Sequence, residues 1–243
     1  MEADFAAALA AAPVEGWLTD GQAARLWQAG RRASTGGGGG AVVEIGSFRG
    51  RSTVVLALAA GSVVAIDPHA GSDRGPQEIA AEATRGDADH AAFLANLRSA
   101  GVDDRVRHVR KFSEDALGDV TGLVSLLYVD GAHRFGPARD DLARWGGRVA
   151  PGGTMLVHDA FSSIGVTLAL LTVCTSGEWR YRGRVGSLAE YERVHSGRAR
   201  ELAAHVRELP WFARNGAIKV LVLAGRRRWA ERIGLDPDAP WPY

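Results

Sequence analysis

The sequence predicts an α/β fold in which an N-terminal helical segment precedes a doubly wound, mostly parallel sheet of seven strands. Short runs rich in Val, Ile and Leu alternate with helical runs, and parallel strands need such helical crossovers between them. The short runs are also apolar along nearly their whole length, which is typical of strands that helices cover on both faces.

The N-terminal 33 residues are expected to be helical, because Leu18, Ala23, Leu26 and Trp27 have the spacing of one apolar helix face. Five consecutive glycines, residues 36–40, cannot hold a helix. They predict a flexible connection into the remainder of the fold.

Beyond this connection, strands and helices are expected in turn, beginning with a strand and a helix over residues 51–60. The expected strands are residues 41–45, 62–67, 106–109, 123–130, 154–159 and 218–224. Two polar segments, 71–89 and 179–215, interrupt the alternation. They are interpreted either as lids or substrate-facing insertions, or as solvated surface.

Length and composition fit one large globular domain over residues 1–243, since 46% of the residues are hydrophobic. We expect a helical extension and glycine-rich linker over 1–40 and a core fold over 41–224. The 29 basic and 28 acidic side chains nearly cancel, and no block of like charge forms a nucleic-acid-binding face. The charge pattern therefore indicates no nucleic-acid partner.

Cys174 is the one cysteine of the sequence and lies in an apolar stretch, so it is expected to be a buried core residue. The Ala-rich N-terminus holds two early acids and lacks a basic region, which argues against a signal peptide. No apolar run approaches the roughly 20 residues that span a bilayer. A cytoplasmic protein without a membrane span is expected.

A glycine turn follows the first expected strand, in the stretch E-I-G-S-F-R-G-R-S-T. Gly46 and Gly50 let the backbone turn tightly and approach a ligand, and the helix that opens at Ser52 and Thr53 offers free N–H groups. The pattern is not G-x-G-x-x-G, because no small residue stands at the second glycine position, so a pyrophosphate would fit poorly.

Asp67 ends the next expected strand, where its carboxylate can accept hydrogen bonds from both hydroxyls of a ribose. A glycine loop alone could be a tight turn, and a strand-end acid alone could be a helix cap. Together, at adjacent strand ends, they predict a ligand that contains adenosine.

Two further strands end in acids, Asp130 and Asp159, and His133 follows the first of them across a glycine. Ligands of a doubly wound sheet bind beyond the carboxyl ends of its strands, so these side chains are expected on the cofactor's rim. Two carboxylates suit Mg²⁺ or a similar ion. An imidazole can take the proton of an attacking hydroxyl. The alternatives are a helix N-cap for Asp159, a turn acid for Asp130 and a surface histidine for His133.

The order of these motifs resembles the class I S-adenosylmethionine-dependent methyltransferases, whose Rossmann-like fold would cover residues 41–224. The resemblance implies that Glu44, Gly46 and Ser47 border the methionine moiety, although Glu44 could instead only hold the loop. It places Ser113 at the adenine edge. The residues expected to bind S-adenosylmethionine are Glu44, Gly46, Ser47, Gly50, Ser52, Thr53, Asp67, Ser113 and Asp130.

The stretch D-G-A-H, residues 130–133, narrows the resemblance to metal-dependent sugar O-methyltransferases of the macrocin and mycinamicin type. In that family the histidine is the proposed base, and this implies that His133 is the catalytic base. Asp130, Asp159 and His158 are the expected metal ligands. His158 stands where the family usually carries Glu or Asp, which leaves open Mn²⁺ in place of Mg²⁺, or a histidine that faces the core.

The acceptor is expected to be a small molecule or an oligosaccharide. A general similarity to mycobacterial polysaccharide methyltransferases suggests O1 of a mannoside in methylmannose polysaccharide synthesis. Five aromatic residues of the 179–215 segment could stack on sugar rings, or could build a core or the interface of a homodimer. They are Trp179, Tyr181, Tyr191, Trp211 and Phe212. The rival functions are methylation of a catechol-like phenol and cofactor binding without catalysis.

Overall fold

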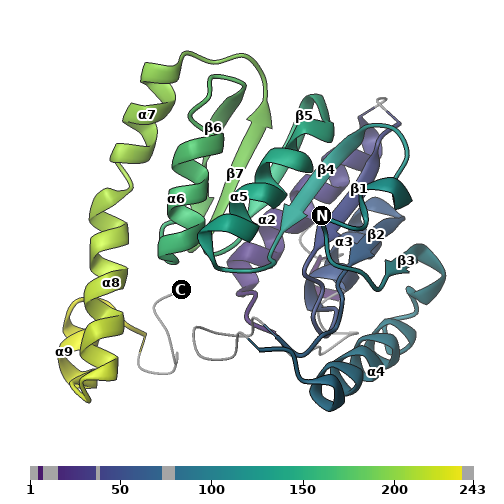
Figure 1. The fold of residues 1–243 in the computed structure, drawn as a ribbon, viewed down its shortest axis with the longest axis horizontal. Helices are drawn as coiled ribbons and strands as arrows, with labels where there is room; N and C mark the ends of the chain where they lie inside the picture. Colours follow the sequence, from purple (N-terminus) through teal and green to yellow (C-terminus); the bar gives the residue numbers. More distant parts are fainter. Residues whose placement is uncertain (1–4, 8–15, 37–38, 73–79, 237–243) are drawn as a thin grey trace.

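The computed structural model describes residues 5–7, 16–36, 39–72 and 80–236. In this part of the chain, a seven-stranded sheet has the order β3-β2-β1-β4-β5-β7-β6 (Figure 1). The strands are β1 (Ala41–Ile45), β2 (Val63–Ile66), β3 (Val106–Val109), β4 (Val124–Val129), β5 (Val149–Val157), β6 (Trp179–Val185) and β7 (Leu188–Arg193). The first five are parallel, and β7 is antiparallel to both β5 and β6. The predicted α/β class, with a mostly parallel doubly wound sheet, is confirmed.

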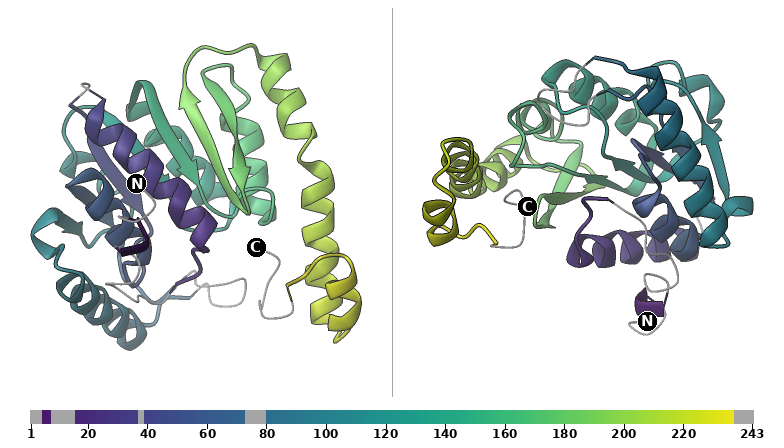
Figure 2. Two further views of the ribbon diagram at one scale, coloured as in Figure 1. Left: turned by 180° about the vertical axis from the view of Figure 1, so that it is seen from behind. Right: turned by 90° about the horizontal axis from the view of Figure 1, so that it is seen from below.

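Helices cover both faces of the sheet. The α-helices are α2 (Asp20–Thr35), α3 (Arg51–Ala60), α4 (Ala83–Ser99), α5 (Phe135–Arg144), α6 (Ile164–Val173), α7 (Arg198–Val206), α8 (Leu209–Leu223) and α9 (Arg227–Arg232). Three short 3₁₀ turns are η1 (Asp103–Arg105), η2 (Leu117–Asp119) and η3 (Gly146–Arg148). Helices α5 and α6 lie in front of the sheet in Figure 1, and α2 lies in front when the molecule is seen from behind (Figure 2). No helix among the described residues is both long and apolar enough to cross a membrane.

Strand β4 shows why the central strands are apolar throughout. Leu126 and Tyr128 pack into the cluster formed with α2 and α3, whereas Leu127 and Val129 pack into the opposite cluster with α5 and α6. Successive side chains of a strand point to opposite faces, so both sets are buried. The next residue along the chain is Asp130, which is only partly buried and begins the site described below.

The N-terminal helical segment is confirmed for α2, which begins after a capping box formed by Thr19 and Gln22. The apolar face predicted from Leu18, Leu26 and Trp27 is buried against the sheet. Residues 1–4, 8–15 and 37–38, which include part of the predicted helix and part of the glycine connection, lie outside the described residues.

Two predictions about the second half of the chain are wrong. Residues 218–224, predicted to be a strand, belong mostly to α8, which starts with Pro210 in its first turn. Residues 179–193, interpreted from the sequence as part of a lid or substrate-facing insertion or as solvated surface, instead form β6 and β7 at the edge of the sheet. Regular pairing of β7 with β5, and of β6 with β7, explains the outcome, because a polar edge strand is stabilised by the neighbouring ladder rather than by its own hydrophobicity.

The aromatic residues of this segment build the core. Trp179 and Tyr191 are buried, and Tyr181, Trp211 and Phe212 pack against the same cluster. Of the other interrupting segment, 71–89, residues 73–79 lie outside the described part, and α4 begins at Ala83. Cys174 is fully buried, as predicted, and burial raises the pKa of its thiol.

Candidate active site

Glu44 lies at the carboxyl end of β1, completely buried against the start of α3. Both of its oxygens accept hydrogen bonds, from the hydroxyls of Ser52 and Thr53. Burial is the main cause that raises the pKa of Glu44 to about 8, and the charges of Asp130 and Asp67 add to it. The three side chains form a closed network that fixes the turn to the helix, which matches the alternative in which Glu44 holds the loop.

Gly46 brings the turn after β1 against the tip of β4. Its φ is +85°, and a Cβ atom here would overlap the carbonyl group of Asp130. Gly50 also has a positive φ, of +90°, and precedes α3. Only glycine adopts such conformations without strain, so the two glycines predicted from sequence set the path of the loop.

Asp67 follows β2 and faces the same loop. Its Oδ2 accepts the N–H of Phe48 at 2.8 Å, and its Oδ1 accepts the N–H of His69 at 2.7 Å. A carboxylate offers about four lone-pair directions, so each oxygen keeps capacity for another donor such as a ribose hydroxyl. Ser47, between these groups in the loop, has a buried hydroxyl for which the described residues supply no hydrogen-bond partner.

His69 is a residue of the loop that sequence reasoning missed. Its Nε2 lies 2.7 Å from the carbonyl oxygen of Phe48, while Phe48 donates to Asp67. Both Phe48 and His69 have positive φ, of 44° and 46°. A non-glycine residue with positive φ is a signal of local function or strain, which only coordinates reveal.

Asp130 is held from two sides. The hydroxyl of Tyr128 donates to Oδ2 at 2.8 Å, and Nδ1 of His158 lies 3.2 Å from Oδ1. His158 is almost fully buried, and burial opposes its positive charge. The negative charge of Asp130 outweighs burial and raises the pKa of His158 well above its usual value. The role of Tyr128 was also not predicted from the sequence, because a tyrosine within an apolar strand is typical of a core residue.

Asp159 lies in the turn between β5 and α6 and pairs directly with Nε2 of His133. Its Oδ1 accepts the hydroxyl of Ser162 at 3.2 Å. Its proposed alternative role as a helix N-cap does not hold, since Ser163 is the N-cap of α6. Burial would raise the pKa of Asp159, but its bonds to His133 and His158 lower it well below its usual value. Burial likewise opposes the charge of His133, yet Asp159 raises its pKa.

The packing of α6 fixes the backbone of His133. The hydroxyl of Ser163 donates to the His133 carbonyl oxygen at 3.2 Å. A Cβ atom on Gly165 would overlap that same oxygen, so the first turn of α6 lies directly against it. The imidazole therefore projects from a backbone that the N-terminus of α6 holds at two points.

Ser113, predicted at the adenine edge, donates its hydroxyl to Asp141 of α5. Asp141 lies near the tip of β4, because a Cβ atom on Gly131 would come within 3.3 Å of its Oδ2. Burial raises the pKa of Asp141 to about 6. Ser113 and Asp141 thus lie on the same edge of the sheet as the glycine loop.

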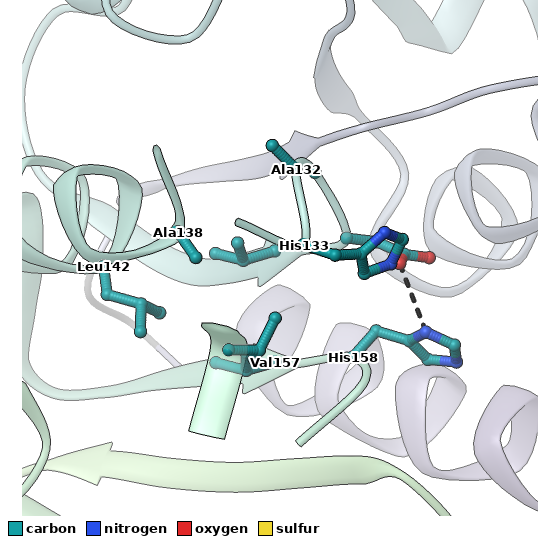
Figure 3. A pocket seen from close by; sticks show the side chains of 10 residues that line it. Ala132, His133, Ala138, Leu142, Val157 and His158 are labelled. Carbon is teal, nitrogen blue, oxygen red and sulfur yellow. Dashed lines mark ion pairs between the residues drawn. The ribbon is translucent and has the colours of Figure 1, made fainter. Parts of the chain in front are cut away.

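The predicted base, His133, and two predicted metal ligands, Asp130 and His158, line a narrow pocket between β4, α5, β5 and α6. The third predicted ligand, Asp159, pairs with His133. Figure 3 shows His133 and His158 at one end of the pocket, with Ala138, Leu142 and Val157 forming its apolar part. One donor atom from each of Asp130, His133 and Asp159 lies within 4.8 Å of the others. His158 contacts Asp130 beside this group. The structure therefore brings the four residues together, but the third donor atom close to the two carboxylates comes from His133 and not from the predicted ligand His158.

The residues present fit the two groups that the sequence implies. Asp67 with spare acceptor capacity and the partnerless Ser47 hydroxyl suit a polar cofactor in the loop. Two carboxylates and an imidazole suit a divalent cation such as Mn²⁺. Mg²⁺ would use fewer protein ligands, since it usually keeps several waters.

The doubly wound sheet with its glycine loop and polar rim defines a Rossmann-like methyltransferase fold. Residues 43–160 match the profile of a family described as a methyltransferase domain, which is just under half of the chain. Over residues 43–160 the chain is therefore similar to a methyltransferase domain.

Solved structures share the fold at low sequence identity. The O-methyltransferase NovP is 16% identical with a TM-score of 0.57, covering 74% of this chain and 84% of its own. The O-methyltransferase from Bacillus cereus, in complex with SAH, is 15% identical with a TM-score of 0.56. The match covers 80% of this chain and 91% of the Bacillus cereus chain. The O-methyltransferase TomG from Streptomyces achromogenes, in complex with SAM, is 18% identical with a TM-score of 0.53. The match covers 79% of this chain and 90% of the TomG chain. A comparison with curated proteins finds no match.

Proposed function

We propose that the chain is an S-adenosylmethionine-dependent O-methyltransferase that uses a divalent cation and methylates a sugar hydroxyl. The observation that carries this is the meeting of Asp130, His133 and Asp159 at the carboxyl end of the sheet. This group adjoins the cofactor loop, because Gly46 packs on the backbone of Asp130. Methyl donor and proton acceptor would therefore lie side by side.

The cofactor assignment is supported by the loop and by relatives of the same fold. Asp67 would accept the ribose hydroxyls, and Ser47 would bond the methionine part of the cofactor. The hydroxyls of Ser52 and Thr53 are committed to Glu44, so these two residues would contribute through the helix start rather than through their side chains. The structures of the Bacillus cereus enzyme and TomG were determined with SAH and SAM.

The reaction moves a methyl group from a sulfonium sulfur to an acceptor oxygen. The carbon–sulfur bond breaks as the carbon–oxygen bond forms, and the acceptor hydroxyl gives its proton to His133. Asp159 orients the His133 ring through their direct pair and stabilises its positive charge afterwards. Asp130 and Asp159 would hold a divalent cation, whose positive charge would lower the pKa of an acceptor hydroxyl. S-adenosylhomocysteine is the other product.

His158 has a supporting role in this proposal. Its Nδ1 bonds Asp130, and Tyr128 bonds the other carboxylate oxygen, so Asp130 is oriented by both. Ligands that second partners hold in this way keep a metal site geometrically fixed. Direct ligation by His158 stays a prediction.

The acceptor is proposed from the sugar methyltransferase resemblance, with O1 of a mannoside as the specific candidate. A catechol-like phenol is the competing acceptor, since it would use the same cation but needs adjacent hydroxyls. Transfer from labelled S-adenosylmethionine to mannosides and to catechols separates them. Turnover on catechols alone would refute the sugar acceptor, and cofactor binding without any transfer would refute the enzyme. A homodimer also stays a prediction, which light scattering can check.

The base is tested by replacing His133. His133→Ala should lower kcat by roughly 10²–10⁴-fold with little loss of cofactor binding, the usual worth of a positioned base. The wild-type rate should rise with pH as the imidazole loses its proton, and that rise should be absent in the variant. A variant that keeps the wild-type pH profile and most of its rate would show that the proton leaves by another route.

A further inference from the structure

Helix α8 contacts the turn that carries Asp159 through two polar side chains on one face. Nδ2 of Asn215 donates to the carbonyl oxygen of Phe161 at 3.2 Å, and Nζ of Lys219 donates to the carbonyl oxygen of Ser162 at 2.8 Å. Residues four apart in a helix lie on the same face. Two side chains one helical turn apart thus hold two consecutive carbonyl groups.

The turn has a conformation that needs such support. Asp159 and Phe161 have φ values of 56° and 57°, which side-chain-bearing residues rarely adopt. The turn closes on itself through the amides of Ser162 and Ser163, which both donate to the Asp159 carbonyl oxygen. The bonds from α8 satisfy the carbonyls of Phe161 and Ser162 in the same turn, so they favour this conformation over a relaxed one.

The same turn determines the geometry of both members of the catalytic pair. It carries the carboxylate of Asp159, and its Ser163 hydroxyl bonds the backbone of His133. Lys219 also acts on the carboxylate electrostatically: burial lowers the pKa of Lys219, and the charge of Asp159 counters this. Helix α8 lies on the outer side of the sheet beyond β6, well separated in sequence from the residues it supports (Figure 1).

The α9 end of the C-terminal helices is connected to this contact. Arg214 donates to Oδ1 of Asn215 at 3.0 Å and to the carbonyl oxygen of Ile233 at 2.9 Å. Its bonds orient the carboxamide of Asn215, so that its nitrogen points to Phe161. The oxygen and the nitrogen of the buried Asn215 side chain therefore each have a hydrogen-bond partner.

We propose that Asn215 and Lys219 are positioning residues that hold the Asp159 turn, and with it the His133–Asp159 pair, in the geometry for methyl transfer. The catalytic part of this inference rests on the proposed function. The two bonds from α8 go to the turn after β5 and not to the glycine loop, so their loss should affect the rate of transfer and leave cofactor affinity in place.

The test compares Lys219→Met, Lys219→Arg and a matched control, Val220→Ser, on the same helix. Met keeps an unbranched side chain, one atom shorter, without the charge or the donor. Arg keeps the charge and the donor, and the control position Val220 is 66% exposed. Three quantities are measured: kcat, the calorimetric affinity for S-adenosylhomocysteine, and amide hydrogen exchange of the peptide that spans residues 159–163. Asn215→Leu is a second variant. Asn215 is fully buried, so if this variant does not fold, the result for Lys219→Met alone decides the test.

We expect Lys219→Met to lower kcat about 10-fold, since small misplacements of a catalytic group cost up to about 10²-fold. Exchange at the turn should accelerate, S-adenosylhomocysteine affinity should stay within about twofold, and Lys219→Arg should recover most of the rate. Val220→Ser should resemble the wild type. Unchanged exchange, or faster exchange with an unchanged kcat, would overturn the proposal, and so would an equal loss of kcat and cofactor affinity.

The exchange measurement does not depend on turnover. If the wild type methylates no acceptor, the proposed function fails, whereas the exchange comparison still decides whether α8 holds the turn. Faster exchange in Lys219→Met, with Val220→Ser unchanged, would then support the structural half of the inference.

Discussion

Replacement of Glu44 by Gln should remove a large pH dependence of stability. Both oxygens of the buried carboxyl accept hydroxyl hydrogen bonds, and burial raises its pKa from 4.5 to about 8. Below pH 4.5 the carboxyl is protonated in the folded and the unfolded chain alike. As pH rises toward 8, the unfolded chain loses the proton that the folded chain keeps, so the free energy of unfolding falls.

The magnitude follows from this shift. Each pH unit between the two pKa values costs about 1.4 kcal/mol of stability, so the whole interval costs roughly 4 to 5 kcal/mol. The carboxamide introduced by Glu44→Gln would resemble the protonated carboxyl in shape and cannot ionise. The difference in free energy of unfolding between Glu44→Gln and the wild type should therefore grow in favour of the variant from about pH 5 to about pH 8.

Urea unfolding followed by circular dichroism at several pH values in this interval measures the difference directly. All other groups titrate in both proteins, so they cancel. Glu178→Gln, a change at an exposed carboxyl, is the matched control and should show no growing difference. A flat difference for Glu44→Gln would mean that Glu44 is ionised in the folded protein over this interval, and the raised pKa would be wrong.

The same variant separates the two roles considered for Glu44. If it only holds the loop, calorimetric affinity for S-adenosylmethionine should change by no more than about threefold, because Gln keeps the shape of the network. A loss of cofactor binding in a stably folded Glu44→Gln protein would instead assign Glu44 a direct contact with the methionine moiety.

Three further predictions concern the loop and the metal. Asp67→Ala should weaken S-adenosylmethionine binding by about 1–3 kcal/mol, because two ribose hydroxyls lose a charged acceptor, and unchanged calorimetric affinity would place the ribose elsewhere. Gly46→Ala should abolish cofactor binding, since its Cβ overlaps the Asp130 carbonyl; an unaltered affinity would show that the loop can move away. EDTA should stop methyl transfer and Mg²⁺ or Mn²⁺ should restore it, while cofactor binding persists; full activity after metal removal would leave the His133–Asp159 pair to act without a cation.

The positions of the first polar residues beyond the strands could be predicted from the sequence. A parallel sheet places the carboxyl ends of its strands on one edge, so Gly46, Asp67, Asp130 and Asp159 were brought together by the order of apolar runs alone. Gly46 and Gly50 also predicted the turn after β1 from the sequence, because few other residues adopt their positive-φ backbone conformation.

The second half of the fold could not be predicted in this way. Residues 218–224 are rich in β-branched residues, yet α8 forms because Asn215, Ile218 and Lys219 face inward with helical spacing. Strand β7 forms because it pairs with the edge of β5, and β6 forms because it pairs with β7 in turn. Both outcomes depend on neighbours that are distant in sequence.

By itself, the sequence determined the class of sheet and the edge on which the site is built, because strand burial and glycine turns are local and periodic properties. Only the tertiary structure decided how the side chains of that edge pair: His133 with Asp159, His158 and Tyr128 with Asp130, and Lys219 with the turn behind them. Pairing of this kind depends on rotamers, on positive-φ turns and on long-range packing of α6 and α8. None of these is encoded in the spacing of residues along the chain, since each is fixed by contacts made after the chain has folded.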